Sequence, residues 1–274
     1  MQSPLRISRI QLSQGQVFWR EVGRDTPIIF LHGAYADGSQ WLEVIDRLAE
    51  RYHCFAPDLL GFGESQPDSP EQSIALQVEC LAEYIEALRL EERPYLVGHS
   101  LGGWVAAGYA AKYGERLQGL VLVAPEGIEV EGWERRWDLE KLLVNRNPLF
   151  FRLLGAIAPL AGLLKMRQKI DETSLSRTRL REHPATCQLL FERPYAEIQP
   201  EFLNQKLAEF HKPTLILQGG SDLPINLAQS KIYAKAIARA KLRVMKNGDG
   251  NLISGWPESI AREIQGFVGV PVFQ

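Results

Sequence analysis

The sequence predicts an α/β protein: a mostly parallel, twisted sheet of about eight strands, with helices on both faces and a helical cap inserted after the sixth strand. Two observations support this prediction. Short apolar or β-branched runs alternate with longer segments whose apolar residues recur at helical spacing, the pattern of strands connected by crossover helices. The 274 residues are 45% hydrophobic and 23% charged, which is typical of a globular chain and argues against disorder or a coiled coil.

The sheet is expected to open with three strands. Ile7–Leu12 and Gln16–Val22 are interpreted as an antiparallel pair. Pro27–Leu31 is apolar throughout, as expected of a strand that is buried on both faces. Trp41–Arg51 then carries apolar residues at helical spacing and predicts the first helix.

Two further strands follow, each with a helix behind it. Cys54–Pro57 predicts a strand, and a Gly-rich loop separates it from the expected helix Ser73–Leu90. Pro94–Gly98 predicts the next strand, and the helix Leu101–Tyr113 follows almost at once. This order of strand and helix favours parallel neighbours in one sheet.

The sixth expected strand, Gln118–Ala124, is followed by a break in the rhythm. From residue 125 to about 212 only helical patterns occur, and a connection of that length is more typical of a cap than of a loop. The rhythm resumes with a strand, a helix, a strand and a last helix at Pro213–Gln218, Leu227–Arg239, Lys241–Lys246 and Pro257–Val268. We therefore expect an α/β core from residues 1–127 and 212–274, and a helical cap from residues 128–211.

Charge and targeting signals exclude several classes of partner. Lys and Arg number 31 against 33 Asp and Glu, so the net charge is −2, and no footprint for nucleic acid or an anionic membrane is present. The longest apolar run, Leu149–Leu164, is interrupted by Arg152 and Pro159 and is too short to predict a membrane span. The N-terminus has neither the basic start nor the apolar run of a signal peptide, so a cytoplasmic location is expected.

The cysteines predict neither disulfides nor a metal site. Cys54, Cys80 and Cys187 are odd in number and far apart, with no CxxC and no Cys/His spacing that suits zinc, so we expect reduced thiols in the core. No G-x-G-x-x-G follows the first strand and no Walker lysine occurs, which argues against a dinucleotide or phosphate-binding loop. The sequence therefore implies no cofactor and no metal.

The most specific motif is Gly98-His99-Ser100-Leu101-Gly102, a G-x-S-x-G at the junction of a strand and a helix. In such a turn the serine hydroxyl is exposed at the carboxyl end of the strand, and flanking glycines leave room for the tight backbone. The alternative is a Gly/Ser turn without chemistry, but the strand before it and the helix after it favour a nucleophile. The N-terminus of that helix would add positive potential for an oxyanion.

The order of motifs resembles the α/β-hydrolase fold family over nearly the whole chain. The segments that carry the resemblance are His32-Gly33, the Gly-rich loop 58–65, the serine turn, Gly219-Gly220-Ser221-Asp222 and Trp256-Pro257-Glu258. The resemblance implies that Ser100 is the nucleophile and that the backbone N–H groups of Ala34 and Leu101 form the oxyanion hole. It also implies that Asp222 is the acid that orients a catalytic base; the alternative for Asp222 is a solvated turn or a helix cap.

The base itself departs from the family pattern. Members of the family carry a histidine shortly before the last helix, whereas this chain reads Asn247-Gly248-Asp249-Gly250-Asn251-Leu252, with Gly250 in the histidine's place. The neighbouring Asp249 is a poor proton acceptor, since an ordinary carboxylate has a pKa of about 4. Of the five histidines, only His183 could reach the site from the cap as a substitute base, and a lone cap histidine is more often simply exposed. Loss of the base lowers turnover by about 10⁴ to 10⁶, so the chain is expected to be strongly impaired.

The expected cap suggests an apolar small-molecule substrate. It is rich in apolar and aromatic residues: Trp133, Trp137, Leu142, Leu143, Phe150, Phe151, Leu153, Leu154, Ile157, Leu160, Leu163 and Leu164. Most should pack the cap onto the core, and a minority should line the cleft. The cap arginines, Arg135, Arg136, Arg167 and Arg181, are expected to be solvated, with pairing to a substrate carboxylate as the alternative.

The functional hypothesis is a serine hydrolase for a small or medium, apolar ester or related carbonyl compound. It resembles the carboxylesterase and carbon–carbon-bond hydrolase branch of the family. The alternative is a non-catalytic member that binds a small ligand in the same pocket. Lyase or cofactor-free oxygenase chemistry ranks lower, because it also uses the histidine.

Overall fold

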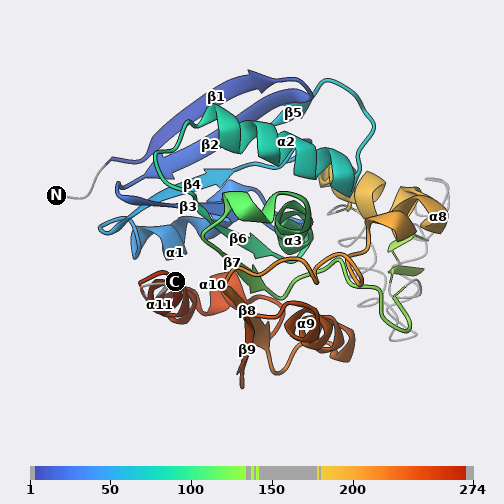
Figure 1. Cartoon of the computed structure of the whole chain (residues 1–274). Helices are drawn as coiled ribbons and strands as arrows, with labels where there is room; N and C mark the ends of the chain where they lie inside the picture. The colour runs from blue at the N-terminus through green and yellow to red at the C-terminus, as the bar shows by residue number, and fades with distance from the viewer. Residues whose placement is uncertain (1–3, 134–136, 139, 142–177, 179, 270–274) are drawn as a thin grey trace, which may run out of the picture.

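The structure, a computed structural model, describes residues 4–133, 137–138, 140–141, 178 and 180–269 (Figure 1). Its centre is one nine-stranded sheet in the order β1-β2-β4-β3-β6-β7-β8-β9, with β5 paired to β2. The strands are β1 (Arg6–Leu12), β2 (Gly15–Val22), β3 (Thr26–Leu31), β4 (Tyr52–Pro57), β5 (Gln66–Pro67), β6 (Tyr95–His99), β7 (Gly119–Val123), β8 (Thr214–Gly219) and β9 (Ala240–Met245). β2 pairs antiparallel with β1, β4 and β5, and all the remaining pairs are parallel.

All eight predicted strands are present, so the predicted fold class is confirmed, with the expected antiparallel pair at the N-terminal edge. The ninth strand, β5, was missed because two residues are too short to show a hydrophobic alternation. It precedes β6, so the sixth predicted strand is β7 in the structure.

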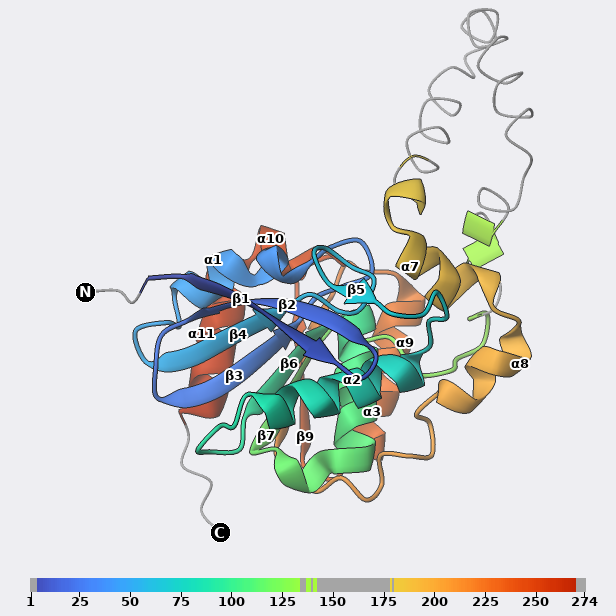
Figure 2. The same cartoon turned by 90° about the horizontal axis from the view of Figure 1, so that it is seen from above.

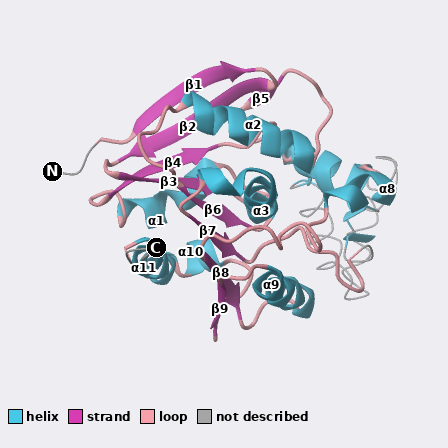
Figure 3. Ribbon diagram, in the orientation of Figure 1, coloured by secondary structure: helices cyan, strands magenta, loops and turns pink. Residues whose placement is uncertain are grey.

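Helices cover both faces of the sheet (Figure 3). The longer ones are α2 (Ile74–Ala87), α3 (Leu101–Tyr113), α9 (Pro224–Ala236) and α11 (Pro257–Val268), and the shorter ones are α1 (Leu42–Asp46) and α10 (Leu252–Gly255). Figure 1 shows α2, α3 and α9 on one face and α1, α10 and α11 on the other. The two layers agree with the expected architecture, although the predicted helix Trp41–Arg51 is reduced to α1 and the preceding 3-10 turn η1 (Gly38–Trp41).

Alternation along the buried strands builds two cores. In β3, Ile29 and Leu31 pack in the core that contains α2 and α3, whereas Ile28 and Phe30 pack in the core that contains α1 and α11. Because successive side chains of a strand point to opposite faces, one apolar run supplies both layers. The three cysteines are free and buried, as expected.

The segment that follows β7 is described only in part. Of the expected cap, residues 134–136, 139, 142–177 and 179 lie outside the described residues, so the division into core and cap stays a prediction. The described remainder contains α7 (Pro184–Cys187), the π-helical turn η4 (Gln188–Glu192), α8 (Tyr195–Ile198) and the 3-10 turn η5 (Gln199–Glu201). Figures 1 and 2 place α8 at the end of the molecule where α2 begins, and the Ala75 N–H donates to Glu201 there (3.3 Å).

None of the helices in the described part of the chain has the length and apolar character required to cross a bilayer.

Candidate active site

Ser100 occupies a strained turn between β6 and α3. Its backbone has φ 50° and ψ −113°, a left-handed conformation that costs a non-glycine residue about 1–3 kcal/mol. The Ser100 N–H donates to the carbonyl of Val123 (3.0 Å), and the Ser100 carbonyl accepts from the N–H groups of Trp104 and Glu126 (3.1 Å each). These bonds to β7 and α3 hold the turn in place.

The glycines of the motif are required by close backbone contacts. A Cβ atom on Gly98 would lie 2.3 Å from the carbonyl oxygen of Gly102, and one on Gly102 would lie 2.4 Å from that of His32. Both distances are well below van der Waals contact. The predicted reason for glycines on either side of Ser100 therefore agrees with the structure.

A cavity of about 460 Å³ brings together all five residues that the sequence singled out: Ser100, Ala34, Leu101, Asp222 and Gly250. The other residues that line it are Gly33, Tyr35, Ala36, Gln40, His99, Ala124, Glu126, Trp137, Leu190, Asn226 and Asn251. Most of these residues follow β3, β6, β7, β8 and β9 in the chain, so they lie at the carboxyl edge of the parallel strands. Ligands of open α/β sheets bind at this edge.

The backbone N–H groups of Ala34 and Leu101, two residues that line this cavity, have no acceptor among the described residues. Leu101 is the first residue of α3, so its N–H has no partner within the helix. Ala34 follows β3, and its carbonyl accepts a hydrogen bond from the Thr186 hydroxyl. The N–H of Gly33 instead donates to Oε1 of Gln40 (3.0 Å). Two such donors can stabilise a developing negative charge on oxygen.

The Asp222 carboxylate lies between the end of β8 and the start of α9. Oδ1 accepts from the Leu223 N–H (2.7 Å) and from Nδ2 of Asn226 (2.8 Å). Oδ2 accepts from Nε2 of Gln218 (2.8 Å), whose Oε1 in turn accepts from the Ser230 hydroxyl (2.6 Å). Three donors thus fix the orientation of this carboxylate.

Gly250 faces that carboxylate. A Cβ atom on Gly250 would lie 3.2 Å from Oδ1 of Asp222 and 3.7 Å from its Cγ and Oδ2. Asp249, the carboxylate considered above as a weak substitute base, is exposed, does not line the cavity, and accepts a hydrogen bond from the Asn251 N–H (2.9 Å).

The two buried histidines of the motifs are neutral. Burial lowers the pKa of His99 to about 4, and this effect outweighs a hydrogen bond with the Gly250 backbone and the charge of Asp222. Burial also lowers the pKa of His32. Nε2 of His32 accepts from the Leu59 N–H (2.9 Å), so Nδ1 carries the proton and donates to the Gly33 carbonyl (2.9 Å).

His183 is separated from the cavity by the ring of Tyr35. It contacts Tyr35 edge to face, with ring centroids 5.7 Å apart, and Tyr35 lines the cavity whereas His183 does not. Of the expected cap aromatics, Trp137 lines the cavity, while Trp133 packs edge to face on Trp104 (6.4 Å). The other apolar cap residues named above lie outside the described residues, as do Arg135, Arg136 and Arg167.

The sequence analysis missed one carboxylate in the cavity, Glu126. It is 5% exposed, and its Oε2 accepts from Nε2 of Gln229 in α9 (3.2 Å). Its main-chain carbonyl accepts from the Tyr233 hydroxyl (2.6 Å). An acidic residue just after an apolar strand, at the edge where Ser100 and Asp222 were expected, was the available signal.

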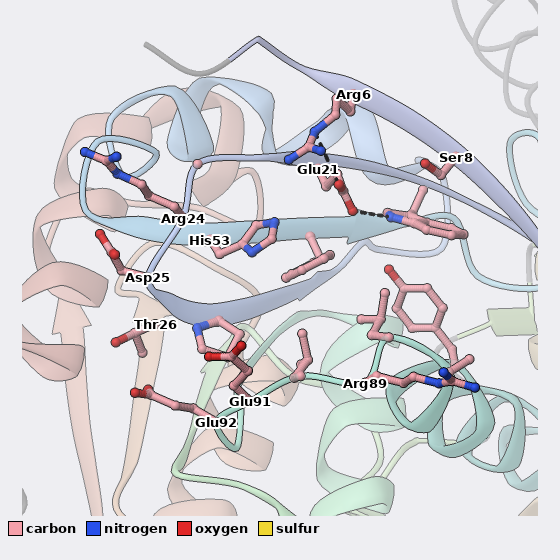
Figure 4. A pocket seen from close by; sticks show the side chains of 18 of the residues that line it. Arg6, Ser8, Glu21, Arg24, Asp25, Thr26, His53, Arg89, Glu91 and Glu92 are labelled. Carbon is pink, nitrogen blue, oxygen red and sulfur yellow. Dashed lines mark hydrogen bonds and ion pairs between the residues drawn. The ribbon is translucent and has the colours of Figure 1, made fainter. Parts of the chain in front are cut away.

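A larger hollow, of about 890 Å³, lies elsewhere in the structure and contains none of the predicted site residues. β1, β2 and β4 and the end of α2 surround it (Figure 4). Arg6 pairs with Glu21 at its rim (3.5 Å), and the ring of His53 points into it from β4. Because the convergent serine, carboxylate and N–H groups are all in the smaller cavity, size alone does not identify the active site.

The comparisons with known proteins identify the fold family. The family model described as "alpha/beta hydrolase fold" matches residues 26–253. Monoacylglycerol lipase ABHD6 of Mus musculus is 26% identical over 257 residues, which are 90% of this chain and 76% of that protein. 1-acylglycerol-3-phosphate O-acyltransferase ABHD5 of Mus musculus is 36% identical over 168 residues, 58% of this chain and 46% of that protein.

Solved structures show the same architecture. The crystal structure of a membrane phospholipase A, a bacterial virulence factor, superimposes with a TM-score of 0.74 at 26% identity, and covers 97% of this chain and 86% of that one. The curated relatives include lipases and an acyltransferase, so the chain is hydrolase-like. The match over most of its length shows that this chain belongs to the α/β-hydrolase fold family.

Proposed function

We propose that the cavity is the active site of a serine hydrolase for small or medium, apolar esters or related carbonyl compounds, strongly impaired because its base is missing at Gly250. One observation carries the proposal: Ser100 on its strained turn, two N–H groups without acceptors and the oriented Asp222 line one cavity. These are the parts that acyl transfer requires, apart from a proton acceptor.

In the proposed reaction, Oγ of Ser100 attacks the carbonyl carbon of the ester. The carbonyl oxygen gains negative charge and accepts hydrogen bonds from the N–H groups of Ala34 and Leu101, with added potential from the N-terminus of α3. Collapse of this intermediate expels the alcohol and leaves an acyl group on Ser100, which water then releases as a carboxylic acid. Both attacks require removal of a proton, and in the described structure no imidazole is hydrogen-bonded to Asp222.

The substrate preference follows from the lining. Tyr35, Trp137 and Leu190 supply aromatic and apolar surface next to the serine. The relatives named above as lipases and a phospholipase support an ester of an apolar acid as the substrate class. The alternative, a ligand-binding protein without turnover, is favoured by the missing base alone.

The test measures hydrolysis of p-nitrophenyl esters with short and medium acyl chains by the chain as it is, by Gly250→His, and by Gly250→His combined with Ser100→Ala. We expect histidine to raise turnover by about 10⁴-fold and the serine substitution to abolish the gain. Circular dichroism establishes that each variant is folded. If a folded Gly250→His variant is no more active than the unsubstituted chain, the ligand-binding alternative replaces this proposal.

A further inference from the structure

Gly250 and Asp222 together line one part of the cavity, and no side chain from position 250 fills this space. The three atoms closest to a Cβ on Gly250 all belong to the Asp222 carboxylate, at 3.2, 3.7 and 3.7 Å. Ser100 and Gly250 line the same cavity. A group that entered this space would contact a fixed carboxylate within the cavity that also contains the serine.

The hydrogen bonds of Asp222 leave one place for a donor. A carboxylate has about four acceptor positions. Oδ1 uses two of them, for the Leu223 N–H and for Asn226, whereas Oδ2 uses one, for Gln218. The remaining position on Oδ2 suits an N–H group.

The charges that line the cavity favour a cation. Among its described lining residues there are two carboxylates, Asp222 and Glu126, and neither lysine nor arginine. His99 supplies no positive charge near neutral pH, because burial lowers its pKa to about 4. A neutral base that takes up a proton here would gain the Asp222 carboxylate as a counter-charge.

We propose that the space at Gly250 binds a nitrogen base of imidazole size from outside the protein, and that this base completes the site. One nitrogen carries a hydrogen that it donates to Oδ2 of Asp222, and the second nitrogen faces Ser100. The inference rests on the proposed function, since it assigns the proton acceptor that the reaction requires.

The proton balance is complete with such a base. The free nitrogen accepts the Ser100 hydroxyl proton as Oγ bonds to the carbonyl carbon, and the resulting cation returns that proton to the departing alcohol oxygen. The same nitrogen then accepts a proton from the water that attacks the acyl group, and returns it to Oγ as the carboxylic acid leaves. The base is regenerated, and the net reaction is ester hydrolysis.

The base can come from two sources, free in solution or carried by the substrate itself. For the free source, p-nitrophenyl acetate hydrolysis is measured against imidazole concentration, with the protein-free rate subtracted. We expect a saturable increase of about 10²-fold, the usual size of general-base catalysis. 1-Methylimidazole is the matched control, because it keeps a basic nitrogen but has no N–H to donate to Asp222.

Three variants assign the effect. Ser100→Ala should abolish the imidazole-dependent rate, and Asp222→Asn should raise the imidazole concentration needed for half saturation. Gly250→His should be active without imidazole and should gain nothing from it. For the substrate-borne source, the methyl esters of histidine and phenylalanine are compared without free imidazole, and faster Ser100-dependent hydrolysis of the histidine ester identifies that source.

The inference fails if Gly250→His is active while neither imidazole nor the histidine ester produces Ser100-dependent turnover in the unsubstituted chain; the proposed function then stands. It also fails if 1-methylimidazole acts as well as imidazole, since Asp222 then plays no part. An inactive but folded Gly250→His variant with no imidazole effect overturns the proposed function as well.

Discussion

A side chain at position 250 would begin 3.2 Å from Oδ1 of Asp222. This distance is short for a carbon–oxygen contact, so a histidine there requires the carboxylate to move by a few tenths of an ångström. Hydrogen bonds from Leu223, Asn226 and Gln218 hold that carboxylate. Asp222 is therefore oriented before any imidazole is present, and a histidine at position 250 must displace its carboxylate slightly.

The first prediction is that the effect of Asp222 depends on what occupies position 250. In the Gly250→His background, Asp222→Asn should lower kcat by about 10⁴-fold, because the imidazole loses the acceptor that sets its tautomer and orientation. In the unsubstituted chain the same substitution should leave p-nitrophenyl butyrate hydrolysis nearly unchanged, since there is no imidazole to orient. Equal losses of kcat in the two backgrounds would show that Asp222 acts directly on the substrate.

The second prediction concerns the glycines beside Ser100. Gly102→Ala should destabilise the protein by about 3 kcal/mol, because its Cβ would meet the main-chain oxygens of His32 and Leu31 at 2.4 and 2.5 Å. Gly266→Ala is the matched control, since its Cβ would meet no atom within 4 Å on the exposed side of α11. It should stabilise by about 0.5–1 kcal/mol. Urea unfolding measures the change in the free energy of unfolding for both variants. A similar change for Gly102→Ala and Gly266→Ala would refute the contact argument.

The fold was predictable from the sequence wherever a segment was long enough to show a period. The fully apolar β3 and the strands after it were found because each supplies both cores. β5 and α10, of two and four residues, are too short to carry a pattern. β5 is placed by its pairing with β2 and α10 by its packing against η1 and α11, which are tertiary effects.

The active-site residues divide in the same way. Ser100 was predicted from a local motif and Asp222 from the family resemblance, whereas Glu126 was missed because its inward position depends on Gln229 and Tyr233, about a hundred residues away in the chain. The sequence did not separate Trp133, which packs on Trp104 and Phe202, from Trp137, which lines the cavity. Whether such a side chain faces the cavity or packs in the core is decided by contacts between distant segments rather than by the local pattern.

The third prediction concerns a buried ion pair at the first residue of the Gly-rich loop. Nη1 of Arg20 lies 2.7 Å from Oδ1 of Asp58, whose side chain is fully buried. Arg20→Met should lower the free energy of unfolding by about 3–5 kcal/mol, because it leaves that carboxylate without its cation. Arg24→Met, at an exposed position, should change it by less than about 0.5 kcal/mol. Similar losses from both substitutions would contradict the role of the pair.

The fourth prediction is a loss of stability in mild acid. Burial lowers the pKa of His99 to about 4, against about 6.5 in the unfolded chain. As the pH falls from 6.5 to 4, the unfolded state therefore binds a proton that the folded state does not, and folding loses about 3 kcal/mol. His99→Gln should remove this part of the loss in urea unfolding between pH 7 and 4.5. An unchanged pH dependence in that variant would show that His99 is protonated in the folded state.

The last prediction compares two buried tyrosines. The Tyr84 hydroxyl, beside the hollow in Figure 4, has no hydrogen-bond partner in the described structure, whereas the Tyr233 hydroxyl donates to the Glu126 carbonyl (2.6 Å). Since a buried hydroxyl without a partner is unfavourable, Tyr84→Phe should raise the free energy of unfolding by about 1 kcal/mol. Tyr233→Phe should lower it by about 1–2 kcal/mol, because it leaves a buried carbonyl unpaired.

Thermal and urea unfolding of both phenylalanine variants measure this difference, and the ring contact of Tyr84 with Trp19 (5.5 Å) is retained in the substitution. If Tyr84→Phe destabilises the protein as much as Tyr233→Phe does, the Tyr84 hydroxyl has a partner in solution. That partner would be water in the larger hollow, which Tyr84 lines.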